Sequence, residues 1–411
     1  MRGGSMERTT CCIVGGGPAG MMLGLLLARA GVEVTVLEKH GDFLRDFRGD
    51  TVHPSTLQLL DELGLGERFA ELPFPKMEEM RMMIGGATVV AADLRRIPGR
   101  HKYIAMVPQW DFLDLLASAA AEEPSFTLRM RTSVTGLRRE GGRVTGVHYV
   151  DEHGETGEIA ADLTVACDGR HSLVRREAGL RPEEFQVPMD VWQVRVDGPR
   201  GGLKDGRVLA RFGDGQAAVT MDRGEYYQTS YLIRKGSDQE LRSQGIQRFR
   251  DRLGALCGWD REVTDAIASW DDVKLLEVSM GRLRRWYRNG LLCIGDAAHT
   301  MSPVGGAGVN IAVQDAVAAA GILAGPLLDG SVCVHDLERV QKRRWLPMAM
   351  VQKSQLTEHK MLEMALDGTL TEDTLPIPLK LLQKVPPLRT VTAYLGGVGI
   401  RPERVPAFAR G

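Results

Sequence analysis

The chain has 411 residues, which is enough for two or three domains. Its 52 basic and 53 acidic residues balance, so no general attraction to nucleic acid or to an anionic membrane surface is implied. The six cysteines form no C-x-x-C pair, which argues against a metal or dithiol site and suits a reduced, cytoplasmic chain. No uninterrupted apolar run reaches the length of a membrane span, and no signal peptide follows the first residues.

The first predicted elements surround a glycine-rich turn. Cys11–Val14 predicts a buried strand, an apolar helix follows to about Ala30, and Val32–Leu37 predicts a second strand. The turn between the first strand and the helix reads Gly15-Gly16-Gly17-Pro18-Ala19-Gly20, which fits the pattern G-x-G-x-x-G. In a dinucleotide-binding βαβ unit, the first glycine of this pattern permits a tight turn, the second admits a pyrophosphate and the third allows close helix packing.

Glu38 ends the second predicted strand, where an acid can accept hydrogen bonds from a ribose. The stretch therefore indicates a dinucleotide site, with a purely structural glycine-rich turn as the alternative. The pattern alone does not separate NAD from FAD.

The next region carries two candidate cofactor contacts. Arg48 lies in a charged loop beyond the second strand, either as a solvated surface residue or as an arginine that reaches back over the cofactor. Gln109 precedes a helix predicted over Trp110–Ala121, and an earlier helix is predicted over Pro54–Leu63. Met77–Ala92 and Leu128–Val150 are strand-like.

An apolar strand, Glu158–Cys167, ends on Asp168-Gly169, with a helix predicted to start near Ser172. A carboxylate at the carboxyl end of a strand in an α/β sheet lies where ligands bind. A turn with a capping acid is the alternative reading.

Short alternating segments between Val187 and Ile267 predict an antiparallel sheet, followed by a helix near Asp238–Leu253. This sheet is rich in aromatic residues, which can form the wall of a pocket for a flat ligand or can be ordinary half-buried residues. They are Trp192, Tyr226, Tyr227 and Tyr231.

A buried strand from Leu291 ends at Gly295-Asp296, where a carboxylate can bind a polyol hydroxyl. A loop with Pro303 and several glycines leads into a helix that starts near Val309, and its N-terminus would stabilise negative charge in the loop. His299 is read as a ligand-binding or as a hydrogen-bonded loop histidine. A helix over Val332–Leu366 and a proline-rich tail follow.

Together these three motifs resemble the FAD-dependent aromatic hydroxylases typified by p-hydroxybenzoate hydroxylase, from about Thr9 to Pro326. The resemblance implies an α/β fold: a Rossmann-like FAD-binding domain (6–75, 102–184 and 276–330), an inserted antiparallel β-sheet substrate domain (76–101 and 185–275) and a C-terminal helical segment (331–411).

The resemblance also implies roles for single residues. Gly15, Gly17 and Gly20 cradle the pyrophosphate, Glu38 holds the adenosine ribose, and Pro18, Ala19 and Lys39 are further cofactor-binding residues. Arg48 and Gln109 flank the cofactor, Asp168 and Gly169 serve FAD and NAD(P)H, His171 lies near the reductant, and Asp296 holds the ribityl chain. The isoalloxazine contacts are Pro303, Gly305, Gly306, Ala307, Gly308, Val309 and Asn310. The residues expected at the chemistry are Arg48, His171, Pro303 and Tyr227.

The implied reaction uses NAD(P)H to reduce FAD, and a flavin C4a-hydroperoxide formed with O₂ hydroxylates an aromatic ring. The arginine that clamps a benzoate carboxylate is not found in Ala217–Met221, so a larger phenol, quinol or polyketide-like substrate is predicted, with Tyr227 and Tyr394 near it. A monomer or homodimer without nucleic-acid partners is expected. The alternatives are a flavin-dependent halogenase, an isoprenoid-type double-bond reductase and a non-catalytic flavoprotein.

Overall fold

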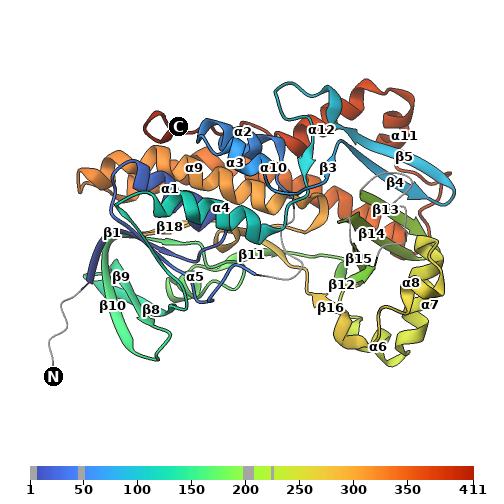
Figure 1. Ribbon diagram of the computed structural model, residues 1–411, viewed down its shortest axis with the longest axis horizontal. Coiled ribbons are helices and arrows are strands. Elements are labelled where there is room, and N and C mark those ends of the chain that lie inside the picture. Colours follow the sequence, from blue (N-terminus) through green and yellow to red (C-terminus); the bar gives the residue numbers. More distant parts are fainter. Residues whose placement is uncertain (1–6, 45–50, 198–207, 224–225) are drawn as a thin grey trace.

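A largely parallel β-sheet forms one end of the molecule (Figure 1). The structure is a computed structural model that describes residues 7–44, 51–197, 208–223 and 226–411. The sheet has eight strands, and five of them, β19, β10, β1, β2 and β7, run parallel. In spatial order its main path is β18 (Tyr287–Arg288), β19 (Leu291–Cys293), β10 (Thr156–Ala166), β1 (Glu7–Val14), β2 (Val34–Leu37) and β7 (Phe126–Arg129), with the hairpin β8 (Ser133–Glu140) and β9 (Arg143–Val150) attached to β10.

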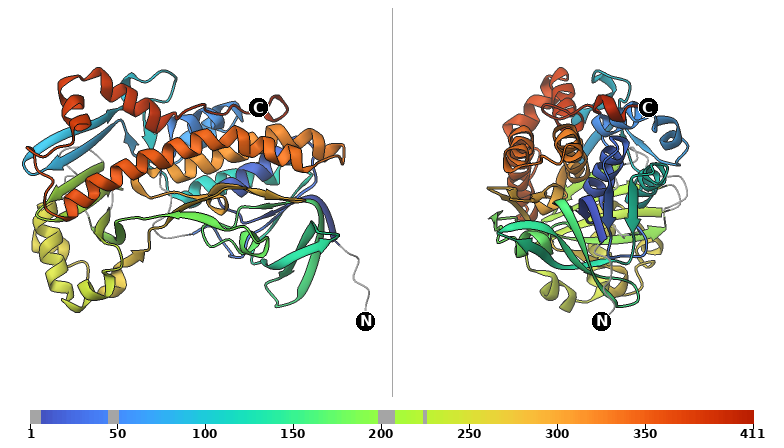
Figure 2. Two further views of the ribbon diagram at one scale, coloured as in Figure 1. Left: turned by 180° about the vertical axis from the view of Figure 1, so that it is seen from behind. Right: turned by 90° about the vertical axis from the view of Figure 1, so that its left-hand side faces the viewer.

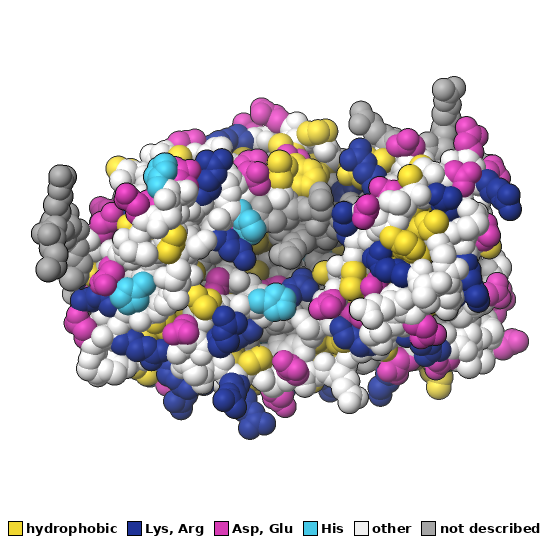
Figure 3. Space-filling view, turned by 90° about the horizontal axis from the view of Figure 1, so that it is seen from below, with side chains coloured by type: hydrophobic (Ala, Val, Ile, Leu, Met, Phe, Trp, Pro, Cys, Tyr) yellow, Lys and Arg dark blue, Asp and Glu magenta, His cyan; other side chains and the backbone are white. Residues whose placement is uncertain are grey.

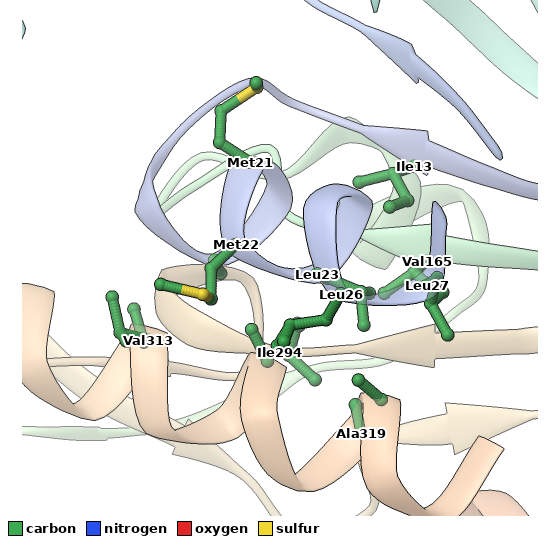
Figure 4. Packing of buried hydrophobic residues seen from close by; sticks show 14 of the residues in the cluster. Ile13, Met21, Met22, Leu23, Leu26, Leu27, Val165, Ile294, Val313 and Ala319 are labelled. Carbon is green, nitrogen blue, oxygen red and sulfur yellow. The ribbon is translucent and has the colours of Figure 1, made fainter. Parts of the chain in front are cut away.

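Helix α1 (Pro18–Arg29) connects β1 to β2 and is buried on nearly all sides. Its apolar residues pack between the sheet and α9 (Ala307–Leu328), as Figure 4 shows for Leu23, Ile294 and Val313. Because α9 packs against α1, α2 and α10, it carries apolar residues around most of its surface. The span Val304–Leu328 is long and apolar enough to cross a membrane, but it lies in the protein core, as core helices of this composition do.

A second sheet of seven strands forms the other end of the molecule. It is antiparallel except for the β13–β4 pair. Its spatial order is β16 (Lys274–Leu276), β12 (Met189–Asp197), β15 (Tyr226–Arg234), β14 (Gln216–Asp222), β13 (Val208–Gly213), β4 (Glu79–Ile84) and β5 (Ala87–Asp93). The segments 76–101 and 185–275 thus meet in one sheet, as expected, while the division of the chain into three domains stays a prediction.

Smaller elements connect the two sheets and cover their faces. The short strands are β11 (Pro182–Phe185), β17 (Met280–Leu283) and β20 (His299–Thr300) in one sheet, and β3 (Lys76–Met77) and β6 (Ile104–Ala105) in another. The short helices are α2 (Pro54–Glu62), α3 (Gly66–Ala70), α5 (Leu173–Glu177), α6 (Asp238–Ser243), α7 (Ile246–Cys257) and α8 (Arg261–Thr264). Gly245, with φ of 90°, separates α6 from α7, so the single helix predicted near Asp238–Leu253 is wrong.

Helix α10 (Val334–Leu366) extends from the part of the molecule with the largely parallel sheet to the part with the seven-stranded sheet, which is clearest from behind (Figure 2). It packs on α9 at one end and on the seven-stranded sheet at the other. The tail that follows contains two more helices, α11 (Ile377–Lys384) and α12 (Pro387–Gly397). Each has a proline in its first turn, where proline is tolerated, and the sequence alone predicted only a proline-rich tail here. Both lie against β5.

Candidate active site

The three glycines of the turn between β1 and α1 have the three different geometries that the G-x-G-x-x-G pattern predicts. Gly15 has φ of 104°, and a Cβ added there would lie 2.5 Å from the carbonyl oxygen of Cys167. A Cβ on Gly20 would lie 2.0 Å from the carbonyl oxygen of Gly15, so this glycine lets the helix pack against the turn. A Cβ on Gly17 would meet no protein atom within 4 Å, so Gly17 faces open space at the start of α1.

Glu38 at the end of β2 closes the first motif. Its side chain is buried, Oε2 accepts a hydrogen bond of 2.8 Å from the backbone N–H of Gly16, and Oε1 accepts one of 3.0 Å from that of His40. The carboxylate therefore fixes the glycine-rich turn and the start of the loop after β2 at once. This second role of Glu38 has no signal in the spacing of the motif.

Asp168 follows β10 and lies beside the glycine-rich turn. Burial raises the pKa of Asp168, while hydrogen bonds from the Ser172 hydroxyl and the Val174 backbone N–H act in the opposite direction. Ser172 also caps α5 by accepting from the backbone N–H of Arg175. Asp168 is thus both a turn residue and a lining residue of the cavity described below, so the two readings of this motif are compatible.

The loop after Asp296 is shaped by two glycines in left-handed backbone conformations. Gly305 has φ of 74° and Gly306 has φ of 63°. A Cβ on Gly306 would lie 2.5 Å from Oγ1 of Thr51, whose hydroxyl donates to the carbonyl oxygen of Gly306 at 2.9 Å. The loop leads directly into α9, which begins at Ala307, close to the predicted start at Val309.

Helix α10 holds the same loop from the other side. Nε2 of Gln355 donates to the carbonyl oxygens of Ser302 and Val304, both at 2.9 Å, and Oε1 of Gln355 accepts from the backbone N–H of Ser302 at 3.1 Å. The Ser302 hydroxyl contacts Nε2 of His359 at 2.9 Å. We call residues 302–306 the flavin loop from here on, after the predicted role of Pro303, Gly305 and Gly306.

A buried ionic network lies beneath the Gly295-Asp296 turn. Asp315 of α9 accepts from the Gly295 backbone N–H at 3.1 Å, contacts Nε2 of His299 at 2.6 Å and accepts from Nε of Arg344 at 3.0 Å. Burial by itself raises the pKa of Asp315, but His299 and Arg344 outweigh burial and hold this pKa below its ordinary value. His299 is therefore a hydrogen-bonded core histidine, and it does not line the cavity.

One cavity of about 1750 Å³ extends from the glycine-rich turn to the seven-stranded sheet. The space-filling view from below shows a hollow near the middle of the molecule, with Lys, Arg and His side chains beside it (Figure 3). Most of the predicted cofactor-binding residues line the cavity. They are Gly15, Gly17, Pro18, Ala19, Glu38, Lys39, Gln109, Asp168, Gly169, His171, Asp296, Pro303, Gly305, Gly306, Ala307, Gly308 and Val309.

Other predicted residues are placed elsewhere. Gly20 serves helix packing, and the buried Asn310 side chain accepts hydrogen bonds from Ser55 at 2.9 Å and Thr56 at 2.6 Å instead of lining the cavity. Arg48 lies outside the described residues. Tyr394 packs beside the cluster around Leu94 and does not line the cavity.

Three of the four aromatic residues predicted for the pocket wall, Trp192, Tyr227 and Tyr231, lie on the outer face of the seven-stranded sheet, and the fourth, Tyr226, does not line the cavity either, so the predicted wall is wrong. Tyr227 is buried and stacks on Trp259 with ring centroids 5.7 Å apart, and Trp192 and Tyr231 pack against Phe249 of α7. Successive side chains of a strand point to opposite faces, so Tyr227 and Tyr231 share one face of β15. The amphipathic helix α7 covers that face.

The opposite, inner face of the sheet lines the cavity instead, mostly with aliphatic residues, methionines and one phenylalanine, together with the polar residues Arg81, Gln193, Gln228 and Ser230. The apolar residues are Met82, Met189, Val191, Ala210, Phe212, Val219, Met221 and Leu232. The cavity also receives residues from α10 and from the chain around α12, which carry no recognisable motif. The sequence alone therefore missed this part of the wall.

Tyr227→Phe is expected to leave the fold at least as stable and any hydroxylation unchanged. The Tyr227 hydroxyl is buried and finds no hydrogen-bond partner among the described residues, so its removal relieves a desolvation cost of about 1 kcal/mol. Tyr231→Phe is the matched control, because the Tyr231 hydroxyl donates to Oε1 of Gln216 at 2.9 Å and its loss should cost about 1 kcal/mol. Denaturant unfolding compares the two variants. Loss of hydroxylation in a well-folded Tyr227→Phe protein would restore the predicted catalytic role.

Comparison with known proteins agrees with this geometry. The family described as FAD binding domain matches residues 8–354 of the chain. A 6-methylpretetramide 4-monooxygenase from Streptomyces rimosus is 33% identical over 386 residues, which are 93% of this chain and 91% of that protein. The solved structure of an anhydrotetracycline hydroxylase from Streptomyces rimosus is 25% identical with a TM-score of 0.77, and the match covers 96% of this chain and 77% of that one.

The chain therefore belongs to the FAD-binding family of flavoprotein aromatic monooxygenases. It is an FAD-dependent oxidoreductase of the aromatic-hydroxylase class, with O₂ and a small aromatic molecule as substrates. The expected fold class and the FAD cofactor are confirmed. A further relative from Streptomyces rimosus, named 12-dehydrotetracycline 5-monooxygenase/anhydrotetracycline 6-monooxygenase, is 30% identical over 322 residues, 74% of this chain and 60% of that protein.

Proposed function

We propose that this protein hydroxylates a neutral, multi-ring phenol of the aromatic polyketide type, with NAD(P)H as the reductant. The observation that carries the proposal is the cavity of about 1750 Å³ that joins the glycine-rich turn to an apolar sheet face. Pockets for one small ligand are typically about 300–1,000 Å³, so this cavity has room for FAD and a second, sizeable molecule. Relatives named for 6-methylpretetramide and anhydrotetracycline support a substrate of similar chemistry.

The chain's own residues suit FAD along the first half of the cavity. Gly17 offers open space beside the backbone N–H groups at the start of α1, where a pyrophosphate would lie. Asp296 would take the ribityl chain, and the flavin loop with the N-terminus of α9 would take the isoalloxazine ring. When bound, FAD supplies the hydride acceptance and the O₂ chemistry. The protein's task is to orient the substrate at the ring and to exclude water.

The inner face of the seven-stranded sheet supports a neutral substrate. Met82, Met221 and Leu232 present apolar side chains, and methionine adapts to flat ligands of different outline. Arg223 lies near this face, but its guanidinium donates to Oε1 of Gln228 and to the carbonyl oxygen of Met106. Arg81 of β4 also lines the cavity, but its guanidinium already pairs with Glu79 at 2.6 Å. A substrate carboxylate buried against this mostly apolar face would therefore lose its hydration without gaining a dedicated cationic partner, at a cost of several kcal/mol.

The remaining parts of the proposal concern the reductant and the cellular setting. His171 and Asp168 line the cavity at the edge that an NAD(P)H molecule would approach, and no second dinucleotide fold is present in the described ranges. The choice between NADH and NADPH has no basis in these residues. A cytoplasmic monomer or homodimer without nucleic-acid partners completes the proposal.

The test measures NAD(P)H oxidation in air by the FAD-loaded protein, with product analysis. We expect 2-naphthol and larger neutral phenols to stimulate oxidation and to be hydroxylated, whereas p-hydroxybenzoate leaves the basal rate unchanged. Met221→Glu is the matched variant, because a carboxylate on the sheet face should abolish stimulation by the neutral phenols without releasing FAD from the other half of the cavity. Coupled hydroxylation of p-hydroxybenzoate at the rate of the best neutral phenol would overturn the proposal.

A further inference from the structure

A carboxyl group on α10 faces the cavity beside the flavin loop. Glu358 lines the cavity, and its Oε1 accepts a hydrogen bond of 3.1 Å from the hydroxyl of Ser354, one turn earlier in the helix. Its Oε2 lies 3.8 Å from the position that a Cβ on Gly305 would occupy. The described residues offer Oε2 neither a hydrogen bond nor an ion pair. One oxygen of this carboxylate is therefore held, and the other is available to a molecule in the cavity.

The position of Glu358 relative to the flavin loop is fixed by its own helix. Gln355 lies three residues earlier in α10 and binds the backbone of the loop at Ser302 and Val304 through three hydrogen bonds. Because less than one helix turn separates Gln355 from Glu358, a movement of this part of α10 away from the loop would break this clamp, and the hydrogen bond from Ser354 restrains the Glu358 side chain itself. The geometry is therefore pre-organised, which acid–base catalysis requires.

The surroundings of Glu358 suit a base. Burial raises the pKa of Glu358, and the Ser354 hydroxyl opposes this shift only in part. Met361 and Leu362 continue the same helix along the cavity wall with apolar side chains. A carboxylate with a raised pKa accepts protons more readily than one in water.

We propose that Glu358 is the general base of the hydroxylation step, and that its Oε2 accepts the proton of the substrate's phenol group. This inference rests on the proposed function. As the ring carbon bonds to the incoming oxygen atom, the O–O bond of the oxidant would break, and its electron pair would leave with the second oxygen, which takes a proton from solvent. At the same time the phenol O–H bond breaks, its electron pair forms a C=O bond, and the proton moves to Oε2. The ring then loses its C–H proton to solvent, and the carbonyl oxygen takes the proton back from Glu358. The carboxylate is thereby regenerated, and the oxidant remains the FAD and O₂ of the main reaction.

The acidity of the phenol hydroxyl before and after the ring reacts determines when this proton transfer occurs. A phenol has a pKa of about 10, well above that of a carboxyl group, so the transfer is unfavourable before the ring reacts. Once the ring carbon carries the new oxygen, the phenol oxygen becomes carbonyl-like and its proton becomes strongly acidic. Glu358 would therefore act while the new bond forms, and general-base assistance of this kind typically contributes on the order of 10²-fold or more in rate.

The decisive variant is Glu358→Gln in the FAD-loaded protein. With 2-naphthol as the probe, we expect single-turnover hydroxylation to fall on the order of 10²-fold, with H₂O₂ released instead of product. The rate of flavin reduction by NAD(P)H should stay unchanged, and so should the affinity for 2-naphthol, followed by its fluorescence. With 6-cyano-2-naphthol, whose hydroxyl is more acidic, the difference between wild type and variant should shrink markedly because less help from a base is needed.

Two further variants serve as controls. Glu363→Gln removes a carboxylate from the exposed side of the same helix and should hydroxylate 2-naphthol like wild type. Glu358→Asp keeps a carboxylate on a shorter side chain and should recover part of the lost rate, even if Glu358→Gln proves unstable.

Two kinds of result would contradict the proposals, and they can be told apart. Hydroxylation by Glu358→Gln within about threefold of wild type, or an equal loss with both naphthols, would overturn the role of Glu358 as base. A wild-type protein that binds FAD but hydroxylates no neutral phenol would overturn the proposed function itself.

Discussion

Replacing Arg344 by methionine is expected to lower the free energy of unfolding by about 3–5 kcal/mol, the usual cost of leaving one partner of a buried ion pair alone. Arg344 is 1% exposed, donates from Nε to Asp315 at 3.0 Å and from Nη1 to Glu403 at 3.2 Å. Without it, the fully buried Asp315 keeps two partners among the described residues, His299 and the Gly295 backbone N–H. Denaturant unfolding of the FAD-loaded proteins measures the difference.

The matched control is Arg339→Met on the same helix. The Arg339 side chain is 52% exposed and pairs with Asp336 at 3.4 Å, so its loss should change the free energy of unfolding by less than about 1 kcal/mol.

The pH dependence of stability provides a second check. The lowered pKa of Asp315 stabilises the protein above the ordinary carboxyl pKa of 3.8, and this contribution is lost as the pH falls through the lower pKa of the folded state. The difference in free energy of unfolding between wild type and Arg344→Met should therefore become smaller in acid. Equal free energies of unfolding at neutral pH would contradict the expectation.

Gly17→Ala is expected to lower FAD affinity at least tenfold, more than about 1.4 kcal/mol, while the apoprotein unfolds like wild type. The backbone of Gly17 has φ of −76°, which alanine adopts freely, and the added Cβ would touch no protein atom within 4 Å. The only space that the methyl group takes is the space proposed for the pyrophosphate. Flavin fluorescence titration and thermal unfolding of the apoprotein give the two numbers.

Substitutions of two other glycines serve as controls for Gly17→Ala. Gly20→Ala should impair both FAD binding and folding, because its Cβ would lie 2.0 Å from the carbonyl oxygen of Gly15. Gly325→Ala, in α9 with no atom within 4 Å of the added Cβ, should bind FAD normally and gain up to about 1 kcal/mol of stability. Full flavin retention by Gly17→Ala would show that the pyrophosphate lies elsewhere.

The part of the site that could be predicted from sequence is the part built by short segments. In the G-x-G-x-x-G turn, the positive φ of Gly15 and the close packing of Gly20 against Gly15 arise within one βαβ unit, as predicted, whereas the pyrophosphate contact of Gly17 stays a prediction. Asp168 and Asp296 both follow parallel strands, so their positions at one edge of the sheet follow from the strand order.

The rest depends on contacts between distant segments, which leave no local pattern. The alternation along β15 already places Tyr227 and Tyr231 on one face, but only the position of α7 decides that this face is the outer one. Asn310 lies in a recognisable motif, yet its side chain turns to Ser55 and Thr56 of α2, some 250 residues earlier in the chain. Gln355 and Glu358 stand in an ordinary helical stretch, and only the three-dimensional structure brings them to the flavin loop.

The length of α10 has a consequence for engineering. Because one unbroken helix clamps the flavin loop at Gln355 and contributes Met361 and Leu362 to the cavity wall, the proposed substrate pocket extends beyond the seven-stranded sheet. In a chimera that exchanged only 76–101 and 185–275 with a relative, the sheet face of the cavity would come from one protein. The wall contributed by α10 and the chain around α12 would come from the other. Transfer of substrate preference between relatives should therefore require residues 351–397 to move together with the sheet.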